Sequence, residues 1–291
     1  MEIYIGAALL GALLQGFAFA MSRQLLVYSH DRTQIVFYGM LVTVLMALLA
    51  LPFMNIRGLG SAPELIVGFS ITVVLSQILL MEAMKRADAS FVVPMLGLKI
   101  FVVALVSALI WQETYNGLVY LGAVGTLISL YFLNDGKLQA PAMAVIFVLL
   151  AAVAYAGNDL FLMSMIRSGY NLGEVTIYSL VGPLLLLGPV AMLKSKGAHN
   201  LNWPYSRALL LFGFFQITSI FALIWAFELS RQVTMVTIVQ NSRAIFALLA
   251  VWLFGRFGFS GVEQLSSAQY RSRLIGAMIM MVSLGLAISA K

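Results

Sequence analysis

Two basic residues, Lys99 and Arg243, lie inside apolar stretches of the chain, where a charged side chain is costly. Each is near the centre of a stretch long enough to cross a membrane, Ser90–Trp111 and Val233–Phe254. At about 1.5 Å per helical residue, roughly 15 Å separates each charge from water. An ionisable group at that depth costs at least about 2.5–3.5 kcal/mol on insertion scales, so it normally faces a polar interior and marks a functional path. We therefore expect Lys99 and Arg243 to line a cavity.

Two cations that face one cavity repel each other, and a bound anion would relieve that repulsion. The leading interpretation is therefore that Lys99 and Arg243 have no resident negative partner and bind a negatively charged substrate. A structural ion pair is the first alternative, and water lining or proton coupling is the second. Among the 11 acidic residues, Glu82, Asp159 and Glu228 lie nearest to membrane depth. Asp159 lies past the centre of its own stretch, by an axial offset on the order of 10 Å.

Further polar side chains occur at the depth where a binding cavity would use them. Gln240 precedes Arg243 by three residues, so both lie on one face of a helix. Any single amide could instead form a hydrogen bond between helices, typically worth well under about 2 kcal/mol, so the evidence is the convergence of several. The predicted substrate-binding residues are Lys99, Arg243, Gln240, Gln15, Gln77, Gln216, Asn158, Asp159 and Tyr155.

The composition requires that the elements holding these residues be membrane helices. The chain has 291 residues, of which 62% are hydrophobic and 10% charged. In a typical soluble domain about one half of the residues are hydrophobic and about one quarter are charged. A membrane helix needs about 20 apolar residues, whereas barrel strands would alternate in polarity, which these stretches do not. Ten spans are predicted, at approximately Ile3–Met21, Gln34–Phe53, Glu64–Met84, Ser90–Trp111, Tyr115–Leu133, Ala142–Met165, Val175–Leu193, Arg207–Phe227, Val233–Phe254 and Leu274–Ser289.

The 17 basic residues predict the orientation of these spans, because Lys and Arg are retained on the cytoplasmic side. Connections after odd-numbered spans hold 11 of them: Arg23, Arg32, Lys85, Arg86, Lys137, Lys194, Lys196, Arg207, Arg256, Arg271 and Arg273. The other connections and the termini hold four: Arg57, Arg167, Arg231 and Lys291. Since 17 − 11 − 4 = 2, only Lys99 and Arg243 are left inside spans. Both termini are therefore expected outside the cytoplasm.

The two halves of the chain are related by a weak internal repeat. A shift of 144 residues places Lys99 on Arg243, so the fourth span lies on the ninth. Repeats of five helices have opposite orientations because five is odd, and inverted repeats of this kind are common in secondary transporters, which bind substrate near the midplane between the repeats. We predict an all-α integral membrane protein of ten transmembrane helices in two inverted five-helix repeats, residues 1–135 and 136–291.

The first half also resembles a known family. Ala83-Met84-Lys85-Arg86-Ala87-Asp88-Ala89-Ser90, Val93-Pro94-Met95-Leu96-Gly97-Leu98-Lys99 and Ser107-Ala108-Leu109-Ile110-Trp111-Gln112-Glu113 resemble the third to fifth helices of EamA-type members of the drug/metabolite transporter superfamily. The resemblance implies a ten-helix carrier, with amino acids, sugar phosphates, nucleotide sugars and amphipathic drugs among the candidate substrates. Members are usually described with cytoplasmic termini, which is the reverse of the orientation that the basic residues predict.

Enzyme chemistry is not expected. The chain has no Cys, no Gly-x-x-x-x-Gly-Lys-Ser/Thr phosphate loop and no Gly-x-Ser-x-Gly nucleophile elbow, and its two histidines have no partners at metal-ligand spacing. We predict no cofactor, no metal and no nucleic-acid partner, and a monomer or homodimer in contact with membrane lipids of the cell inner membrane. The predicted function is alternating-access transport of a small anionic metabolite. The alternatives are a lipid or polyprenyl-phosphate flippase and a non-transporting interaction or sensor protein.

Overall fold

The computed structural model describes the chain over ten segments, and every regular element within them is helical. The described segments are residues 3–28, 31–58, 60, 62–87, 92–93, 95–112, 116–133, 141–194, 202–257 and 266–289. Six helices of this part are long and apolar enough to cross a membrane, and shorter apolar helices accompany them. The protein is therefore an all-α membrane protein, as the composition predicts.

Each expected span overlaps one or two of the described helices. The α-helices are α1 (Ile3–Tyr28), α2 (Arg32–Leu48), α3 (Pro63–Arg86), α5 (Lys99–Trp111), α6 (Gly117–Leu133), α7 (Ala142–Arg167), α8 (Leu172–Lys194), α9 (Trp203–Ser230), α10 (Val233–Gln240), α11 (Arg243–Arg256) and α12 (Ser267–Ser289). Short 3-10 turns occupy Leu51–Phe53 and Leu96–Leu98. The second span ends earlier than expected, because α2 stops at Leu48 and a 3-10 turn with Pro52 follows it.

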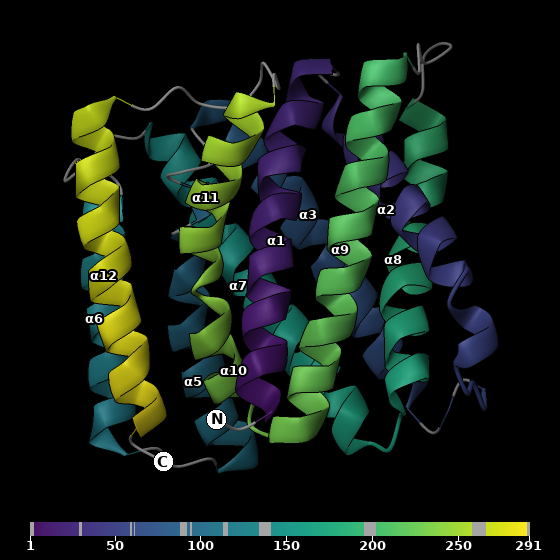
Figure 1. Ribbon diagram of the computed structural model, residues 1–291. Coiled ribbons are helices and arrows are strands. Elements are labelled where there is room, and N and C mark those ends of the chain that lie inside the picture. The colour runs from purple at the N-terminus through teal and green to yellow at the C-terminus, as the bar shows by residue number, and fades with distance from the viewer. Residues whose placement is uncertain are drawn as a thin grey trace.

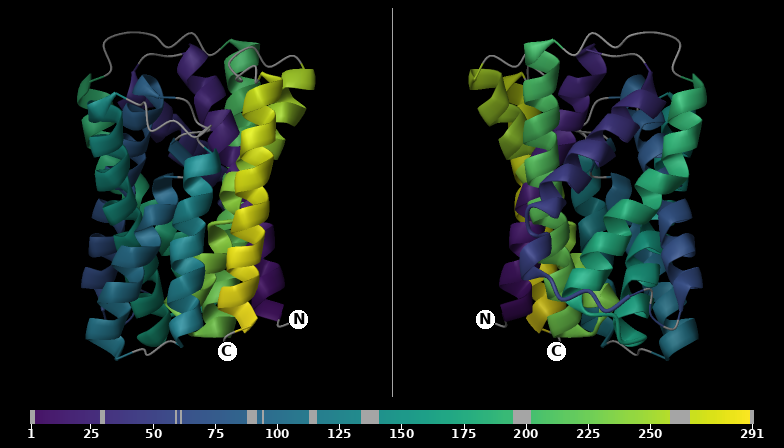
Figure 2. Two further views of the ribbon diagram at one scale, coloured as in Figure 1. Left: turned by 90° about the vertical axis from the view of Figure 1, so that its left-hand side faces the viewer. Right: turned by 90° about the vertical axis from the view of Figure 1, so that its right-hand side faces the viewer.

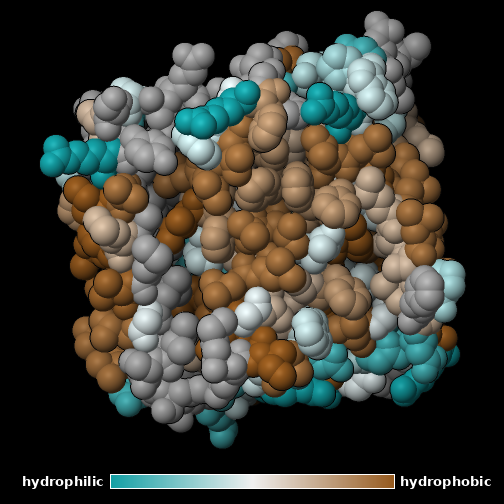
Figure 3. Space-filling model, in the orientation of Figure 1, coloured by the Kyte–Doolittle hydropathy of each residue, from teal (hydrophilic) through white to brown (hydrophobic). Residues whose placement is uncertain are grey.

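The helices run between two polar ends of the molecule with an apolar band between them. Successive long helices alternate in direction, and both termini lie at the same end (Figure 1). We call this the terminal end, and the other the opposite end. The side views show the same arrangement (Figure 2), and the surface is mainly hydrophobic between hydrophilic ends (Figure 3). A helix suits this band because it satisfies its own backbone hydrogen bonds, which lipid cannot do.

Helices from the two halves of the chain pack extensively against each other. The closest-packed pairs are α1 with α9, α3 with α7, and α6 with α12. The pair α6 and α12 lies at one side of the bundle (Figure 1). Gly16 of α1 allows a close approach to α11, since a Cβ atom at this position would lie 2.7 Å from the backbone nitrogen of Ala247. The core is thus built across the two halves rather than within each half.

Two tightened turns precede the two central cations. The 3-10 turn Leu96–Leu98 leads into α5 at Lys99, and a turn at residues 241–242 separates α10 from α11, which begins at Arg243. The side-chain amide of Asn241 donates a hydrogen bond to the carbonyl oxygen of Gly97 at 3.3 Å. These two positions are 144 residues apart, which is the shift that relates Lys99 to Arg243. The two halves therefore cross at matching positions next to the cations.

At the terminal end, the segment between α2 and α3 is fastened to the α7–α8 corner by Glu174. This carboxylate is only 4% exposed and accepts hydrogen bonds from the backbone N–H groups of Arg57 (2.8 Å) and Asn171 (2.9 Å). The Tyr178 hydroxyl donates to the carbonyl oxygen of Gly58, and the Asn171 amide donates to that of Asn55 at 2.8 Å. Four contacts thus hold one loop against a corner from the other half.

The expected division between residues 135 and 136 falls outside the described residues, as does Pro94 within the fourth span. The repeats 1–135 and 136–291 therefore stay predictions.

Candidate functional site

An elongated cavity of about 120 Å³ lies among helices α1, α2, α3, α7, α8, α9 and α10. Its lining extends from Leu25, close to the opposite end of α1, to Phe227, close to the terminal end of α9. Seven of the nine predicted site residues line it: Gln15, Gln77, Tyr155, Asn158, Asp159, Gln216 and Gln240. Lys99 and Arg243 do not line it, but they lie directly behind this polar surface.

Most of the cavity wall is apolar. Six helices contribute its aliphatic and aromatic side chains, which include Ile35, Val73, Leu162, Phe212 and Leu223. An engineered apolar cavity of about 150 Å³ holds one benzene molecule, so the space in this conformation suits a small group of atoms. A cavity with apolar walls and a few convergent polar groups is the usual form of a small-molecule site.

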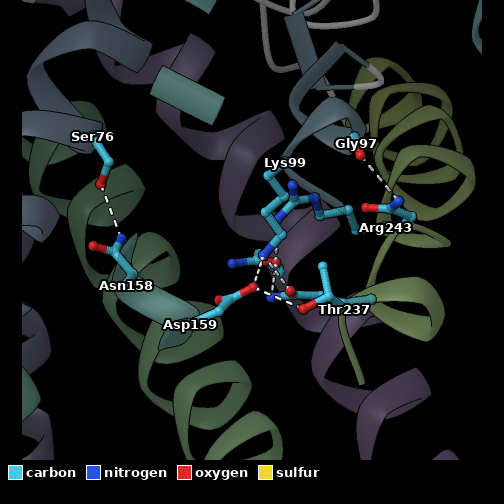
Figure 4. Close-up of polar contacts among 10 residues, drawn as sticks. Ser76, Gly97, Lys99, Asn158, Asp159, Thr237 and Arg243 are labelled. Atoms are coloured by element: carbon cyan, nitrogen blue, oxygen red, sulfur yellow. Dashed lines mark hydrogen bonds and ion pairs between the residues drawn. The ribbon is translucent and has the colours of Figure 1, made fainter. Parts of the chain in front are cut away.

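Lys99 is paired with a carboxylate, so the expectation that it lacks a resident negative partner is wrong. Its ammonium nitrogen lies 2.5 Å from Oδ2 of Asp159 and donates a second hydrogen bond to Oε1 of Gln240 at 2.6 Å. The Lys99 side chain is fully buried, whereas Asp159 reaches the cavity wall. Thr237 also donates to Oδ2 of Asp159, at 3.0 Å, and Figure 4 shows both donors converging on this carboxylate.

The sequence-based estimate of depth missed this pair because it compared each residue with the centre of its own stretch. Both α5 and α7 end at the terminal end (Figure 1). Lys99 lies 12 residues before the end of α5 (111 − 99), and Asp159 lies 8 before the end of α7 (167 − 159). The difference of four residues is about 6 Å, which the four-carbon stem of a lysine can span.

Arg243 differs from Lys99, since no carboxylate of the described residues lies within ion-pair distance of it. Its Nη1 donates to Oε1 of Gln15 at 3.1 Å, but its Nε and Nη2 atoms are buried with no hydrogen-bond partner in the described part of the chain. The guanidinium carbon lies 5.6 Å from the ring centre of Phe19 and 6.0 Å from that of Tyr155. Aromatic faces attract a cation but leave its N–H groups unsatisfied. Arg243 therefore retains unused capacity to bind an anion.

One hydrogen-bond network joins the two cations to the cavity. Gln240 accepts from Lys99 and donates through its Nε2 to Oε1 of Gln15 at 3.0 Å, and the same oxygen of Gln15 accepts from Arg243. Gln15, Gln240 and Asp159 are the members that reach the cavity. A ligand in the cavity can therefore act on both cations through residues that already contact them.

The remaining predicted residues form a second polar group on the cavity wall. The Nε2 of Gln77 donates to the hydroxyl of Tyr155 at 3.0 Å. The Nδ2 of Asn158 donates to Ser76 Oγ at 3.1 Å, on the side away from Lys99 (Figure 4). The Oδ1 of Asn158 is buried without a partner among the described residues and could accept a hydrogen bond. Gln216 lines the cavity from α9.

Three further residues contact the site but were not predicted from the sequence: Thr237, Ser76 and Phe19. Thr237 precedes Gln240 by three residues and Arg243 by six, so the helical spacing that pointed to Gln240 could also have pointed to Thr237. Ser76 and Phe19 carry no comparable signal, because their roles depend on which helices pack against α7 and α11. The central cluster has the formal charges of Lys99, Arg243 and Asp159, which sum to +1.

The fold is shared with solved structures. Twenty-eight chains of known structure match this one. One of them, described only as the crystal structure of a protein, is 15% identical with a TM-score of 0.64, and the alignment covers 99% of this chain and 97% of that one. At this identity the likeness shows the fold alone. No curated protein matches the chain in sequence.

A family comparison agrees with the membrane fold. Residues 2–135 match the sequence model of the EamA-like transporter family. This segment includes the helices α1 to α6, and with them Gln15, Gln77 and Lys99. Proteins of this family are generally transporters. Residues 2–135 of this multi-pass membrane protein are therefore similar to the EamA-like transporter family.

Proposed function

We propose that the protein is a secondary transporter that moves a small monoanion with an apolar body by alternating access, through ten helices arranged as two inverted five-helix repeats. The observation that carries the choice of cargo is the excess positive charge behind the cavity, where two buried nitrogen atoms of Arg243, Nε and Nη2, have no hydrogen-bond partner among the described residues. The sequence predicts two cations that are available to an anionic cargo. The structure reduces that number to one, because Lys99 is paired with Asp159.

The packing of the helices supports the inverted repeat. An inverted repeat would make α1 equivalent to α7, α3 to α9 and α6 to α12. Exchanging equivalent helices converts the contact between α1 and α9 into the contact between α7 and α3, and both contacts are among the most extensive in the bundle. The same exchange leaves the contact between α6 and α12 unchanged. The tightened turns before Lys99 and Arg243 also correspond, and Asn241 contacts Gly97 at the shift of 144 residues. The family match ends at residue 135, where the first repeat is expected to end.

The cavity supports a cargo with a single charge and an apolar body. Its walls are mostly aliphatic and aromatic, and an isolated charge enters such a space only if a partner neutralises it. The cluster offers one unmatched positive charge. Gln15, Gln77, Gln216, Gln240 and Asn158 can orient the polar part of the cargo by hydrogen bonds, while Tyr155 and the apolar side chains contact its body.

Counterflow in proteoliposomes tests this function. We expect saturable counterflow of a branched monocarboxylate such as 4-methyl-2-oxopentanoate. Arg243→Gln should raise the half-saturating concentration more than about tenfold, equivalent to about 1.4 kcal/mol. Arg256→Gln on the same helix is the matched control, because Arg256 is exposed at the helix end.

A second variant tests the charge itself. Gln15→Glu places a carboxylate beside Arg243 and should weaken monocarboxylate counterflow while the protein stays folded. If no monocarboxylate moves but labelled lipid crosses between leaflets, the flippase alternative is the correct one. We also propose the cell inner membrane as the site of action and a monomer or homodimer as the working form.

A further inference from the structure

We propose that Asp159 takes up a proton when an anionic cargo replaces it at Lys99, so that the transporter moves one proton together with each anion. This inference rests on the proposed function, since it needs an anionic cargo. It assigns a proton-binding role to a carboxylate that already has a partner.

Asp159 is placed between a buried ammonium and the cavity. Its Oδ2 accepts hydrogen bonds from Lys99 at 2.5 Å and from Thr237 at 3.0 Å, and the residue also lines the cavity wall. Lys99 has no exposed surface. A carboxylate that arrives through the cavity therefore meets Lys99 only where Asp159 now binds it.

The charges of this cluster link the anion to the proton. Lys99 is fully buried and needs a negative partner, so Asp159 cannot be neutralised while it is the only anion in contact with that ammonium. A cargo carboxylate that takes the place of Asp159 at Lys99 separates Asp159 from that ammonium, and a carboxylate left in an apolar wall without its cation favours the protonated form. A proton from the aqueous side then joins Asp159 as the cargo carboxylate pairs with Lys99. Release of the cargo reverses both steps.

The surroundings of Asp159 hold few other groups that could take this proton. Arg243 on α11 and Lys99 on α5 are the cations of the cluster, and Tyr155 lies one turn earlier on α7. The side chains that α1, α2, α3, α8, α9 and α10 contribute to the cavity wall are uncharged. Among the described lining residues, Asp159 is the one acidic side chain. The proton that accompanies an anion is therefore assigned to Asp159.

Proteoliposomes with an imposed pH gradient test this coupling with 4-methyl-2-oxopentanoate as the probe. We expect the wild-type protein to accumulate the probe on the alkaline side, by about tenfold for each pH unit, as one proton per anion requires. Asp159→Asn cannot exchange a proton, so the counterflow that it supports, at whatever rate, should no longer lead to accumulation of the probe in response to the pH gradient. Glu228→Gln is the matched control, because it removes a carboxylate near the end of α9, away from the cavity.

The outcomes separate the coupling from the transport function. Wild-type counterflow without a response to the pH gradient overturns the coupling and leaves the transporter, and so does accumulation that persists in Asp159→Asn. Absence of wild-type counterflow overturns the proposed function itself. If Asp159→Asn does not fold or does not transport the probe, infrared difference spectra of the wild type decide. Addition of the probe should produce the carbonyl band of a protonated carboxylic acid, and this band should shift in Asp159→Glu; its absence overturns the proposal.

Discussion

A single ion pair, Lys99–Asp159, decides how the central charges of this protein are interpreted. Burial of two charges is expensive, and their attraction offsets that cost only with close contact and additional hydrogen bonds. Both conditions hold here, since Lys99 donates a second hydrogen bond to Gln240 and Asp159 accepts a second hydrogen bond from Thr237. Such a pair is weak evidence for net stability, but the loss of one partner is costly because it leaves the other charge alone in the core.

Lys99→Met should lower the free energy of unfolding by about 3–5 kcal/mol, the usual cost of breaking a buried pair from one side. The double variant Lys99→Met/Asp159→Asn should recover most of this loss, because no uncompensated charge then remains. Thermal unfolding in detergent measures both. A double variant as unstable as Lys99→Met would show that lost packing, and not the charge, causes the effect.

The depth of the polar residues in the membrane could be predicted from the sequence, whereas their interaction partners could not. Depth along an apolar stretch can be counted from the sequence, and four residues placed at depth in this way all line one cavity: Gln15, Gln77, Gln216 and Gln240. The partner of Lys99 could not be predicted, because it depends on the relative heights of α5 and α7 after packing. Whether Lys99 and Arg243 contact substrate stays a prediction.

At the scale of the elements, close helix contacts depend on glycine. Gly16→Ala should lower the melting temperature, because the new Cβ would meet the backbone of α11 at 2.7 Å and 2.8 Å, and overpacking typically costs about 1–3 kcal/mol. Gly285→Ala in α12 is the matched control, since nothing lies within 4 Å of its Cβ position and alanine favours a helix by about 1 kcal/mol. Equal melting temperatures for the two variants would contradict the close contact.

The hydrogen bonds that hold the loop before α3 against the α7–α8 corner depend on Glu174. Glu174→Ala leaves the backbone N–H groups of Arg57 and Asn171 without their acceptor, at a cost of about 1–3 kcal/mol each where they are buried. We expect faster trypsin cleavage after Arg57, because cleavage follows the population of the open loop. Glu64→Ala, an exposed residue at the start of α3, is the control. An unchanged cleavage rate in Glu174→Ala would show that other contacts hold the loop.

The helical type of the elements followed from the sequence more directly than the turns between them. Apolar length predicted the helices, whereas the tightened turns at residues 96–98 and 241–242 carry no Pro or Gly pattern common to both. These turns arise where two chain segments cross. Crossings are a property of the packed bundle and cannot be counted along the chain.

At the scale of the whole molecule, the two ends differ in charge. Arg86, Lys194 and Arg256 lie at the opposite end, whereas Arg167 and Arg231 lie at the terminal end. This placement agrees with the excess of basic residues expected at one end of the bundle. Because Lys and Arg are retained on the cytoplasmic side, we predict that the terminal end faces away from the cytoplasm. The chain has no cysteine, so a single introduced thiol reports unambiguously on orientation.

Ser168→Cys and Ser266→Cys form a matched pair for this measurement, because both serines are exposed, one at each end of the molecule. We expect a membrane-impermeant maleimide to label Ser168→Cys in intact cells and to label Ser266→Cys only after permeabilisation. The reverse pattern would show that the family's usual orientation, with cytoplasmic termini, holds here in spite of the basic residues.

The contact between Asn241 and Gly97 gives the two halves distinct identities. A Cβ atom on Gly97 would be in ordinary van der Waals contact with the amide of Asn241, at 3.5 Å, so this amide already fills the space beside position 97. Two glycines at the crossing would provide no side-chain donor. Residues 1–135 could therefore not form this contact with a copy of themselves, and the single polypeptide guarantees that unlike partners meet.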